Sequence, residues 1–144
     1  MRIVRDAPVQ REPRLQCAAQ VIQLPVESEL MRQILRQSPL GYANRNSHQI
    51  ATRLNLLQVG NAQILTIPGE ALPNIGFYLK RKMRGQHNLL FGLTNDAFGY
   101  LLTKVDWNSF KRYDYVSRTA LGETAGETFI DEALRLVERC PMVR

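Results

Sequence analysis

The sequence has no apolar run approaching the roughly 20 residues that a helix needs to cross a bilayer. Its first residues, MRIVRDAPVQREPR, are charged and lack the apolar segment of a secretory signal. These absences predict a soluble protein with no membrane span and no signal peptide. The composition, 44% hydrophobic and 22% charged, is that of an ordinary globular domain.

Cysteine and histidine are scarce. Cys17 and Cys140 are far apart and form no CxxC pair, and His48 and His87 stand alone without HxH or HExxH spacing. We interpret the cysteines as buried free thiols, with a disulfide as the alternative, and the histidines as surface residues. The sequence also lacks a GxSxG elbow, a P-loop and a dinucleotide fingerprint. Spacing alone therefore indicates a soluble α/β domain with a candidate acidic site.

Positive charge is present in excess, with a formal net charge of +6. The one dense cluster comprises Lys80, Arg81, Lys82 and Arg84, at the end of a predicted helix, where cations complement the helix dipole. A solvated helix end is favoured over a phosphate-binding patch, because no aromatic residues interleave with the cluster as stacking platforms. Nucleic acid is therefore disfavoured as a partner.

The pattern of apolar residues predicts a single α/β domain over residues 15–144, preceded by an extended polar arm over residues 1–14. Strands are expected at Leu15–Leu24, Ile50–Val59, Ala62–Ile67 and Leu89–Thr94, the last one buried, with a hairpin turn at Gly60–Asn61. Helices are expected at Glu27–Gln37 and Leu72–Arg84, and from a capping box at Thr124–Glu127 onward. Residues 95–122 are expected to be irregular. The predicted fold is a mixed sheet of four to five strands with three main helices packed against it.

One carboxylate, Glu70, stands at a junction between strand and helix in the stretch IPGEALPNIG. It is either an acid at a helix N-terminus, favoured by the dipole, or part of a site at the sheet's edge. The following junction carries Asn95 and Asp96, which are typical turn residues, and then Tyr100, a candidate half-buried tyrosine. If the two strands are neighbours, Glu70 and Tyr100 lie at the same edge of the sheet.

Three stretches in order, LTIPGEALPNIGFYLK, LLFGLTNDAFGYLLTK and KRYDYVSRTALG, followed by a final helix, resemble the neutral ceramidases and their bacterial relatives. The resemblance runs from about Ala51 to Val137. The family consists of zinc-dependent amidohydrolases that cleave the N-acyl bond of ceramide. The resemblance implies that Glu70 and Tyr100 are zinc ligands and that Tyr113 lies near the reaction centre, with Asp114 replacing the family's glutamate.

The sequence also departs from the family pattern. The family completes its zinc site with two histidines from the N-terminal half of a longer catalytic domain, and nothing in residues 1–50 matches that segment. The leading hypothesis is therefore a C-terminal part of a ceramidase-like zinc amidohydrolase, inactive alone and dependent on an N-terminal half or partner chain that bears the histidines. The alternative is a non-enzymatic remnant domain that acts in partner binding or self-association. A homo-oligomer is expected, because a missing half would leave an apolar sheet edge or face exposed.

Overall fold

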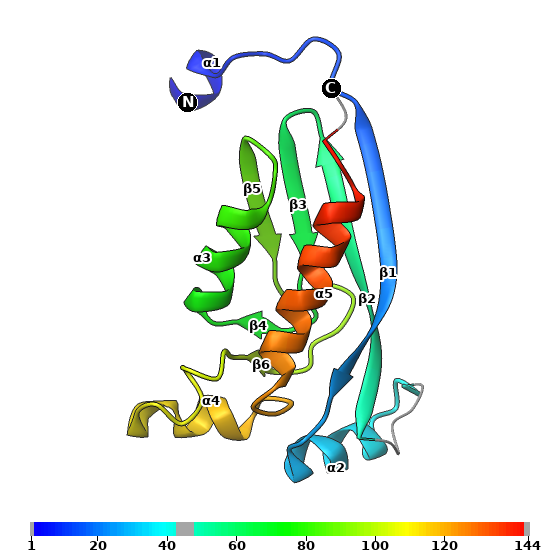
Figure 1. The fold of residues 1–144 in the computed structure, drawn as a ribbon, viewed down its shortest axis with the longest axis vertical. Coiled ribbons are helices and arrows are strands. Elements are labelled where there is room, and N and C mark those ends of the chain that lie inside the picture. Colours follow the sequence, from blue (N-terminus) through cyan, green and yellow to red (C-terminus); the bar gives the residue numbers. More distant parts are fainter. Residues whose placement is uncertain (1, 43–47, 143–144) are drawn as a thin grey trace.

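The computed structural model describes residues 2–42 and 48–142, and its regular elements form two sheets with helices (Figure 1). The strands are β1 (Leu15–Pro25), β2 (Gln49–Val59), β3 (Ala62–Thr66), β4 (Glu70–Ala71), β5 (His87–Phe91) and β6 (Tyr100–Leu101). The α-helices are α1 (Arg2–Asp6), α2 (Glu29–Gln37), α3 (Pro73–Lys82), α4 (Asp114–Arg118) and α5 (Ala125–Arg139), with a 3₁₀ turn, η1, at Lys111–Tyr113.

The main sheet has four strands in the order β1-β2-β3-β5. β1 pairs antiparallel with β2, and β2 with β3. β3 pairs parallel with β5, and helix α3 lies between these two strands in the sequence. β4 and β6 form a separate two-stranded parallel sheet. The structure confirms the predicted mixed α/β fold, including the hairpin between β2 and β3.

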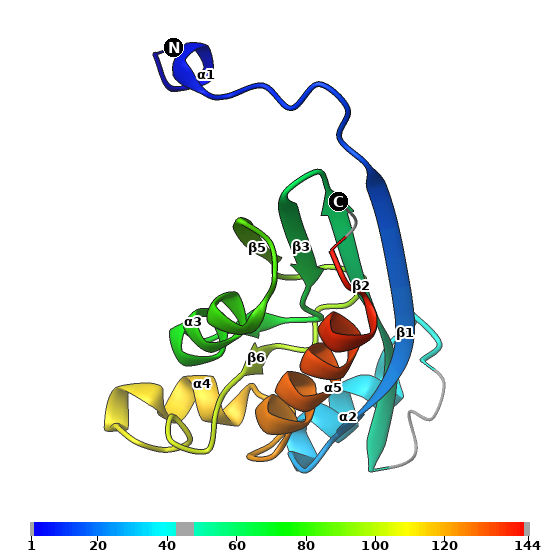
Figure 2. The same cartoon turned by 45° about the horizontal axis from the view of Figure 1, so that its top comes forward.

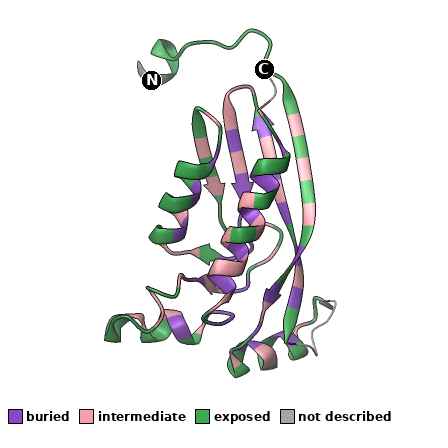
Figure 3. Cartoon of the chain, in the orientation of Figure 1, coloured by how far each residue is buried: buried purple, intermediate pink, exposed green. Residues whose placement is uncertain are grey.

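Helices α3 and α5 cover one face of the main sheet (Figures 1 and 2). Alternate residues of each strand point toward this inner face, where they are buried on β2 and β3 and at the end of β1 and half-buried elsewhere (Figure 3). The core joins these strand residues to one stripe of each helix. It contains Ile22, Leu24, Leu54, Leu56 and Leu65 from the strands, Ile75 and Leu79 from α3, and Phe129, Ala133 and Val137 from α5.

Several expectations from the sequence are corrected by the structure. The arm over residues 1–14 contains the short helix α1, and the span 95–122 holds β6, η1 and α4 rather than irregular chain alone. β5 begins two residues earlier than expected, and it is an edge strand with an exposed face rather than a buried strand. In α2, helical spacing predicts one apolar face of Leu30, Met31, Ile34 and Leu35, but only Met31 and Leu35 are buried, and Leu30 and Ile34 are half exposed.

The start of α5 also differs from the expected capping box. Thr124 makes no side-chain cap, and the Glu127 carboxylate accepts a hydrogen bond from the Lys104 backbone N–H instead. The carboxylate that reaches the start of the helix is Glu27, from the segment between β1 and α2. It accepts hydrogen bonds from the Thr124 backbone N–H at 3.1 Å and from the Thr124 hydroxyl at 2.6 Å. A tertiary contact therefore replaces the local one.

Both cysteines are free thiols, as predicted, but only Cys140 is buried, and Cys17 is exposed on β1. The basic cluster lies in the last turn of α3 and the residues just after it, and Lys82 stacks over the Tyr78 ring. Within residues 2–42 and 48–142, no helix combines the length and apolar character needed to cross a membrane.

Candidate functional site

The β4–β6 pair brings Glu70 and Tyr100 together. The two residues are direct partners in the parallel register. The Glu70 backbone N–H donates to the Gly99 carbonyl at 2.9 Å, and the Leu72 N–H donates to the Leu101 carbonyl at 3.0 Å. Residues paired in register lie on the same face of a sheet. The carboxylate and the phenol, thirty positions apart in the sequence, therefore stand side by side.

Two glycines allow the backbones to approach at this corner. A β-carbon on Gly69 would lie 2.5 Å from the Gly99 carbonyl oxygen. Gly99 has a φ of +75°, and a β-carbon there would overlap the Thr119 carbonyl oxygen. Only glycine meets both demands at Gly99, because side chains disfavour positive φ and there is no room for one. The site is thus built on a close backbone crossing.

Tyr100 is held from its other side by the segment that follows α4. Its backbone N–H donates to the Thr119 carbonyl at 3.3 Å, and it forms an isolated parallel bridge with Ala120. This arrangement places α4 beside β6. The Tyr115 ring of α4 lies edge-on to the Tyr100 ring, with 6.1 Å between ring centroids. The candidate site therefore gathers one carboxylate and two phenols.

The electrostatics of the pair favour a protonated Tyr100. The negative Glu70 carboxylate is the largest cause that raises the pKa of Tyr100 above its ordinary value of 10.0, and partial burial, Tyr115 and a side-chain hydrogen bond with Glu70 act in the same direction. A neighbouring anion disfavours the phenolate, because two negative charges would face each other. At neutral pH, Tyr100 is therefore a neutral donor beside an exposed carboxylate.

The structure excludes one of the two interpretations of Glu70 left open by the sequence. Helix α3 begins at Pro73, its N-cap residue Leu72 makes no side-chain cap, and its first turn contains no acidic residue. Glu70 lies in β4, before the helix, so it is not a helix-capping acid. The expectation that Glu70 and Tyr100 lie at one edge of the main sheet needs correction, since they pair in the separate β4–β6 sheet.

Tyr113, the tyrosine expected near the reaction centre, lies at the end of η1. Its ring contacts Phe110, with 5.7 Å between centroids, and the Arg112 guanidinium lies 5.5 Å from the ring centroid. The tyrosine whose ring meets Tyr100 is Tyr115, two residues later. Sequence reasoning missed Tyr115 because the stretch KRYDYVSR offers two tyrosines with no spacing rule to separate them. A catalytic role for Tyr113 stays a prediction.

The donor set tests whether a zinc ion would be held by this chain alone. Glu70 and Tyr100 are both oxygen donors, whereas catalytic zinc sites have at least three protein ligands and usually include histidine. Across the described residues, no three His, Cys, Asp or Glu side chains group closely enough to hold a metal. His48 lies 2.5 Å from the Arg32 guanidinium, and His87 is the first residue of β5. The residues present are suited to part of a zinc site and do not complete one.

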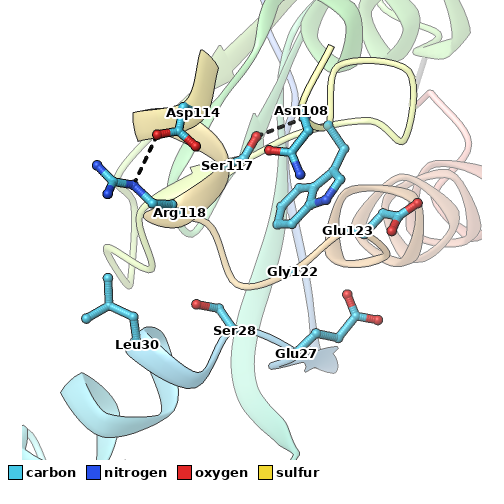
Figure 4. Close-up of a pocket in the computed structure, with 10 residues that line it drawn as sticks. Glu27, Ser28, Leu30, Asn108, Asp114, Ser117, Arg118, Gly122 and Glu123 are labelled. Atoms are coloured by element: carbon cyan, nitrogen blue, oxygen red, sulfur yellow. Dashed lines mark hydrogen bonds and ion pairs between the residues drawn. The ribbon is translucent and has the colours of Figure 1, made fainter. Parts of the chain in front are cut away.

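A separate pocket of about 550 Å³ lies between the start of α2, helix α4 and the segment before α5 (Figure 4). In Figure 4, Ser28 and Leu30 lie across the gap from Ser117 and Arg118 of α4. The Trp107 ring and side chains of both charge signs contribute to the lining. The lone tryptophan, in a long connection, is the one weak signal from which this pocket could have been predicted.

Glu27 links this pocket to helix α5. Partial burial alone would raise the pKa of the Glu27 carboxyl, but hydrogen bonds from the Thr124 hydroxyl and from the Thr124 and Glu123 backbone, together with the Lys104 charge, outweigh it. The pKa of Glu27 is therefore lowered below its ordinary value of 4.5. An ionised carboxylate at a helix start is stabilised by the helix dipole, so Glu27 holds one wall of the pocket in place.

Comparison with known proteins gives a fold likeness. No family model matches the chain, and no curated protein matches it. A solved structure of neutral ceramidase from Pseudomonas aeruginosa is 19% identical over 65% of this chain, with a TM-score of 0.50. A second structure, a ceramidase complexed with C2, is 20% identical over 66% of the chain, with a TM-score of 0.51.

This likeness supports a ceramidase-related fold for the described part of the chain. At this level of identity it does not extend to activity or to individual residues. The chain covers 16% of each of the two ceramidase chains. It therefore matches a small portion of a much larger protein.

Proposed function

We propose that this chain supplies part of the active site of a ceramidase-like zinc amidohydrolase. In this proposal, Glu70 and Tyr100 are two zinc ligands, and two histidines come from an N-terminal half or a partner chain. The observation that carries the proposal is the direct register pairing of Glu70 with Tyr100. The two residues that the resemblance implies as ligands occupy neighbouring positions on one face of a small sheet. The fold likeness to solved ceramidases supports only the ceramidase-related fold in which this pair is set.

The chain's own residues would contribute charge and a proton at this site. Glu70 is an exposed carboxylate, the kind of anionic oxygen that zinc accepts as a ligand. Tyr100 is protonated at neutral pH and its pKa is raised further by the Glu70 carboxylate, so ligation through its oxygen would release that proton. Bound zinc would polarise the amide carbonyl and activate water in the complete site. Because the donor set here is incomplete, the chain alone is expected to be inactive.

Tyr115 competes with Tyr113 for the place near the reaction centre. The edge-on contact between the Tyr115 and Tyr100 rings brings Tyr115 to the pair, whereas the ring contacts of Tyr113 are with Phe110 and Arg112. We favour Tyr115 for this place because a side chain that acts on substrate must lie within reach of the reacting atoms. An N-acyl amide of a lipid-like molecule is the proposed substrate class.

Zinc itself is the probe for this proposal. Added at mildly alkaline pH, zinc should ionise Tyr100 and produce the ultraviolet difference band of a phenolate. The band should be absent in Tyr100→Phe and weakened in Glu70→Gln. It should persist in Tyr78→Phe, which removes a tyrosine on α3. A band of unchanged size in Tyr100→Phe, or no band with zinc and a polypeptide that supplies the two histidines, would contradict the ligand assignment.

Activity gives a second measurement. The chain with zinc should not hydrolyse a fluorogenic N-acyl amide, and hydrolysis should appear only with a polypeptide that supplies histidines. Turnover by the chain alone would show that the site is complete without them.

The alternative function is a non-enzymatic domain that acts by self-association or partner binding. Two observations favour it: the described residues group no three metal-binding side chains, and one face of the main sheet is largely exposed. The zinc titration separates the two functions. A chain that associates with itself but shows no zinc-dependent phenolate would support the non-enzymatic domain.

A further inference from the structure

In residues 2–42 and 48–142, the face of the main sheet opposite α3 and α5 is largely exposed. We define this outer face by the strand residues whose side chains point away from the helices. They are residues 15, 17, 19, 21 and 23 of β1, residues 51, 53, 55, 57 and 59 of β2, residues 62, 64 and 66 of β3, and residues 87, 89 and 91 of β5. One row of aligned partners, Cys17, Leu57, Ile64 and Leu89, crosses all four strands. The alternation of strand side chains therefore builds a continuous second surface.

This outer face is mainly apolar, and its residues on β1 and β5 are exposed. Leu15 and Val21 on β1 are 75% and 67% exposed, and Phe91 on β5 is 50% exposed. The inner-face residues of the same strands are buried, for example Leu24 and Leu56. Exposure is greatest on β1 and β5, whose outer-face residues are all exposed, whereas those of β3 are half-buried or, at Thr66, buried. A continuous apolar surface of this kind on a soluble protein usually marks an interaction site.

The charge of the outer face indicates what binds it. Arg53 is the one residue of this face with a formal charge at neutral pH, and the face carries no carboxylate, although the whole chain has a net charge of +6. Two copies of a chain with that charge repel each other, and the repulsion is least where both surfaces are nearly neutral. A different protein partner would ordinarily be marked by a complementary charge pattern, and this face has none.

The size of the outer face suits a modest dimer. Strands about 4.8 Å apart with a rise of about 3.3 Å per residue give a four-stranded face of roughly 400 Å² in projection, and its accessible area is larger because the side chains stand out from it. Interfaces of standard size bury about 800 Å² on each partner, and weak ones bury less. We propose that the outer face is a homodimer interface, in which two copies of this chain pack sheet against sheet about a two-fold axis.

The proposal does not depend on zinc or on the Glu70–Tyr100 pair, because neither residue belongs to the outer face. Its main test is sedimentation velocity between about 1 and 100 μM, a range that covers a micromolar dissociation constant. The wild-type chain should change from monomer to dimer across this range. Added salt should strengthen the dimer, because it screens the repulsion between the two positive copies.

Charged variants locate the interface. Val21→Lys and Leu89→Lys each place a new cation on the outer face, and each should raise the dimer dissociation constant about tenfold or more, which corresponds to at least about 1.4 kcal/mol. Phe77→Lys on α3 is the matched control, since this side chain is 61% exposed away from the main sheet's outer face. It should leave dissociation unchanged within about twofold. Circular dichroism would verify that each variant is folded.

Thiol labelling gives an independent footprint. Cys17 is exposed on the outer face and Cys140 is buried, so a maleimide should modify Cys17 first, and its labelling should slow as the protein concentration rises. A monomer at every concentration, a dimer insensitive to both outer-face variants, or Cys17 labelling that does not change on dimerisation would each overturn the proposal. Protection of Cys17 only after addition of a different polypeptide would assign the face to another partner, and would overturn it equally.

Discussion

The main sheet and the β4–β6 corner differ in the length of their strands and in what holds those strands together. β1 and β2 are each 11 residues long and pair along their whole length, whereas β4 and β6 have two residues each. The long strands repeat an alternation of buried and exposed residues, so every residue adds to the same arrangement. The short strands are held by Gly69, Gly99 and the Thr119–Ala120 segment, which meet only in the folded chain.

This difference separates stability from function. The main sheet and its helices contain most of the buried apolar side chains, and burial of apolar surface is the dominant stabilising term in folding. The corner contributes few core residues but holds the carboxylate and the phenols of the candidate site. Candidate site residues are thus concentrated where the fold depends on a few specific contacts, and these contacts are open to direct tests.

The largest effect is expected from the inner face of the main sheet. Leu54 is fully buried, so Leu54→Ala should lower the free energy of unfolding by about 2–5 kcal/mol, through lost burial and the cavity left behind. Leu15→Ala on the exposed outer face is the control and should cost less than about 0.5 kcal/mol. Urea unfolding below the dimer concentration range measures both. Equal losses would show that the two faces are not distinguished as the structure has them.

The second test breaks the corner at Gly99. Gly99→Ala should lower the free energy of unfolding by about 2–3 kcal/mol, because it adds a clash with the Thr119 carbonyl to the strain of positive φ. Gly41 also has a positive φ, of +62°, but a β-carbon there would meet nothing within 4 Å. Gly41→Ala therefore measures the backbone strain alone, about 1 kcal/mol. If the two variants were equally stable, the close crossing at Gly99 would be refuted.

A third prediction concerns the start of α5. Glu27→Ala should cost about 1 kcal/mol, because it removes both hydrogen bonds to Thr124. Glu123→Ala, at an exposed neighbouring position, should cost little. The pKa of Glu27 is lowered in the folded state, so its contribution is present above its ordinary value of 4.5 and is lost as pH falls through the lowered value. Unfolding curves should therefore show a stability difference between wild type and Glu27→Ala at neutral pH, and this difference should disappear at acidic pH.

The smallest effect is a spectroscopic one at the site itself. The Glu70 carboxylate is the largest cause of the raised pKa of Tyr100, so Glu70→Gln should shift the alkaline titration of one tyrosine downward, toward 10.0. Tyr100→Phe should remove that transition, and Asp131→Asn on α5 should leave it unchanged. A raised pKa means that this contribution to stability is present below pH 10 and is lost as pH rises through the raised value. A titration identical in wild type and Glu70→Gln would show that the Glu70 carboxylate does not influence the Tyr100 phenol.

Much of the main sheet could be predicted from the sequence. Period-two alternation and the Gly60–Asn61 turn predicted the β2–β3 hairpin. Helical spacing placed Leu72, Ile75, Leu79 and Met83 on one face, and all of these but Leu72, which precedes α3, are buried. The predictions were wrong where a local pattern is compatible with two structures. Thr124 and Glu127 matched a capping box, yet Thr124 donates its hydrogen bonds to the Glu27 carboxylate, which is distant in sequence. β5 was expected to be buried because its continuous apolar run does not reveal that the sheet ends there.

The sequence by itself determined which segments alternate, which helices are amphipathic, and that a lone glutamate follows the Pro68–Gly69 turn. These features depend on the spacing of residues along the chain, and spacing is visible in one dimension. Only the tertiary structure decided that Glu70 pairs with Tyr100, that Tyr115 rather than Tyr113 meets the Tyr100 ring, and that one sheet face stays largely exposed. Each of these depends on which distant segments come into contact, and that is decided by packing across the whole core.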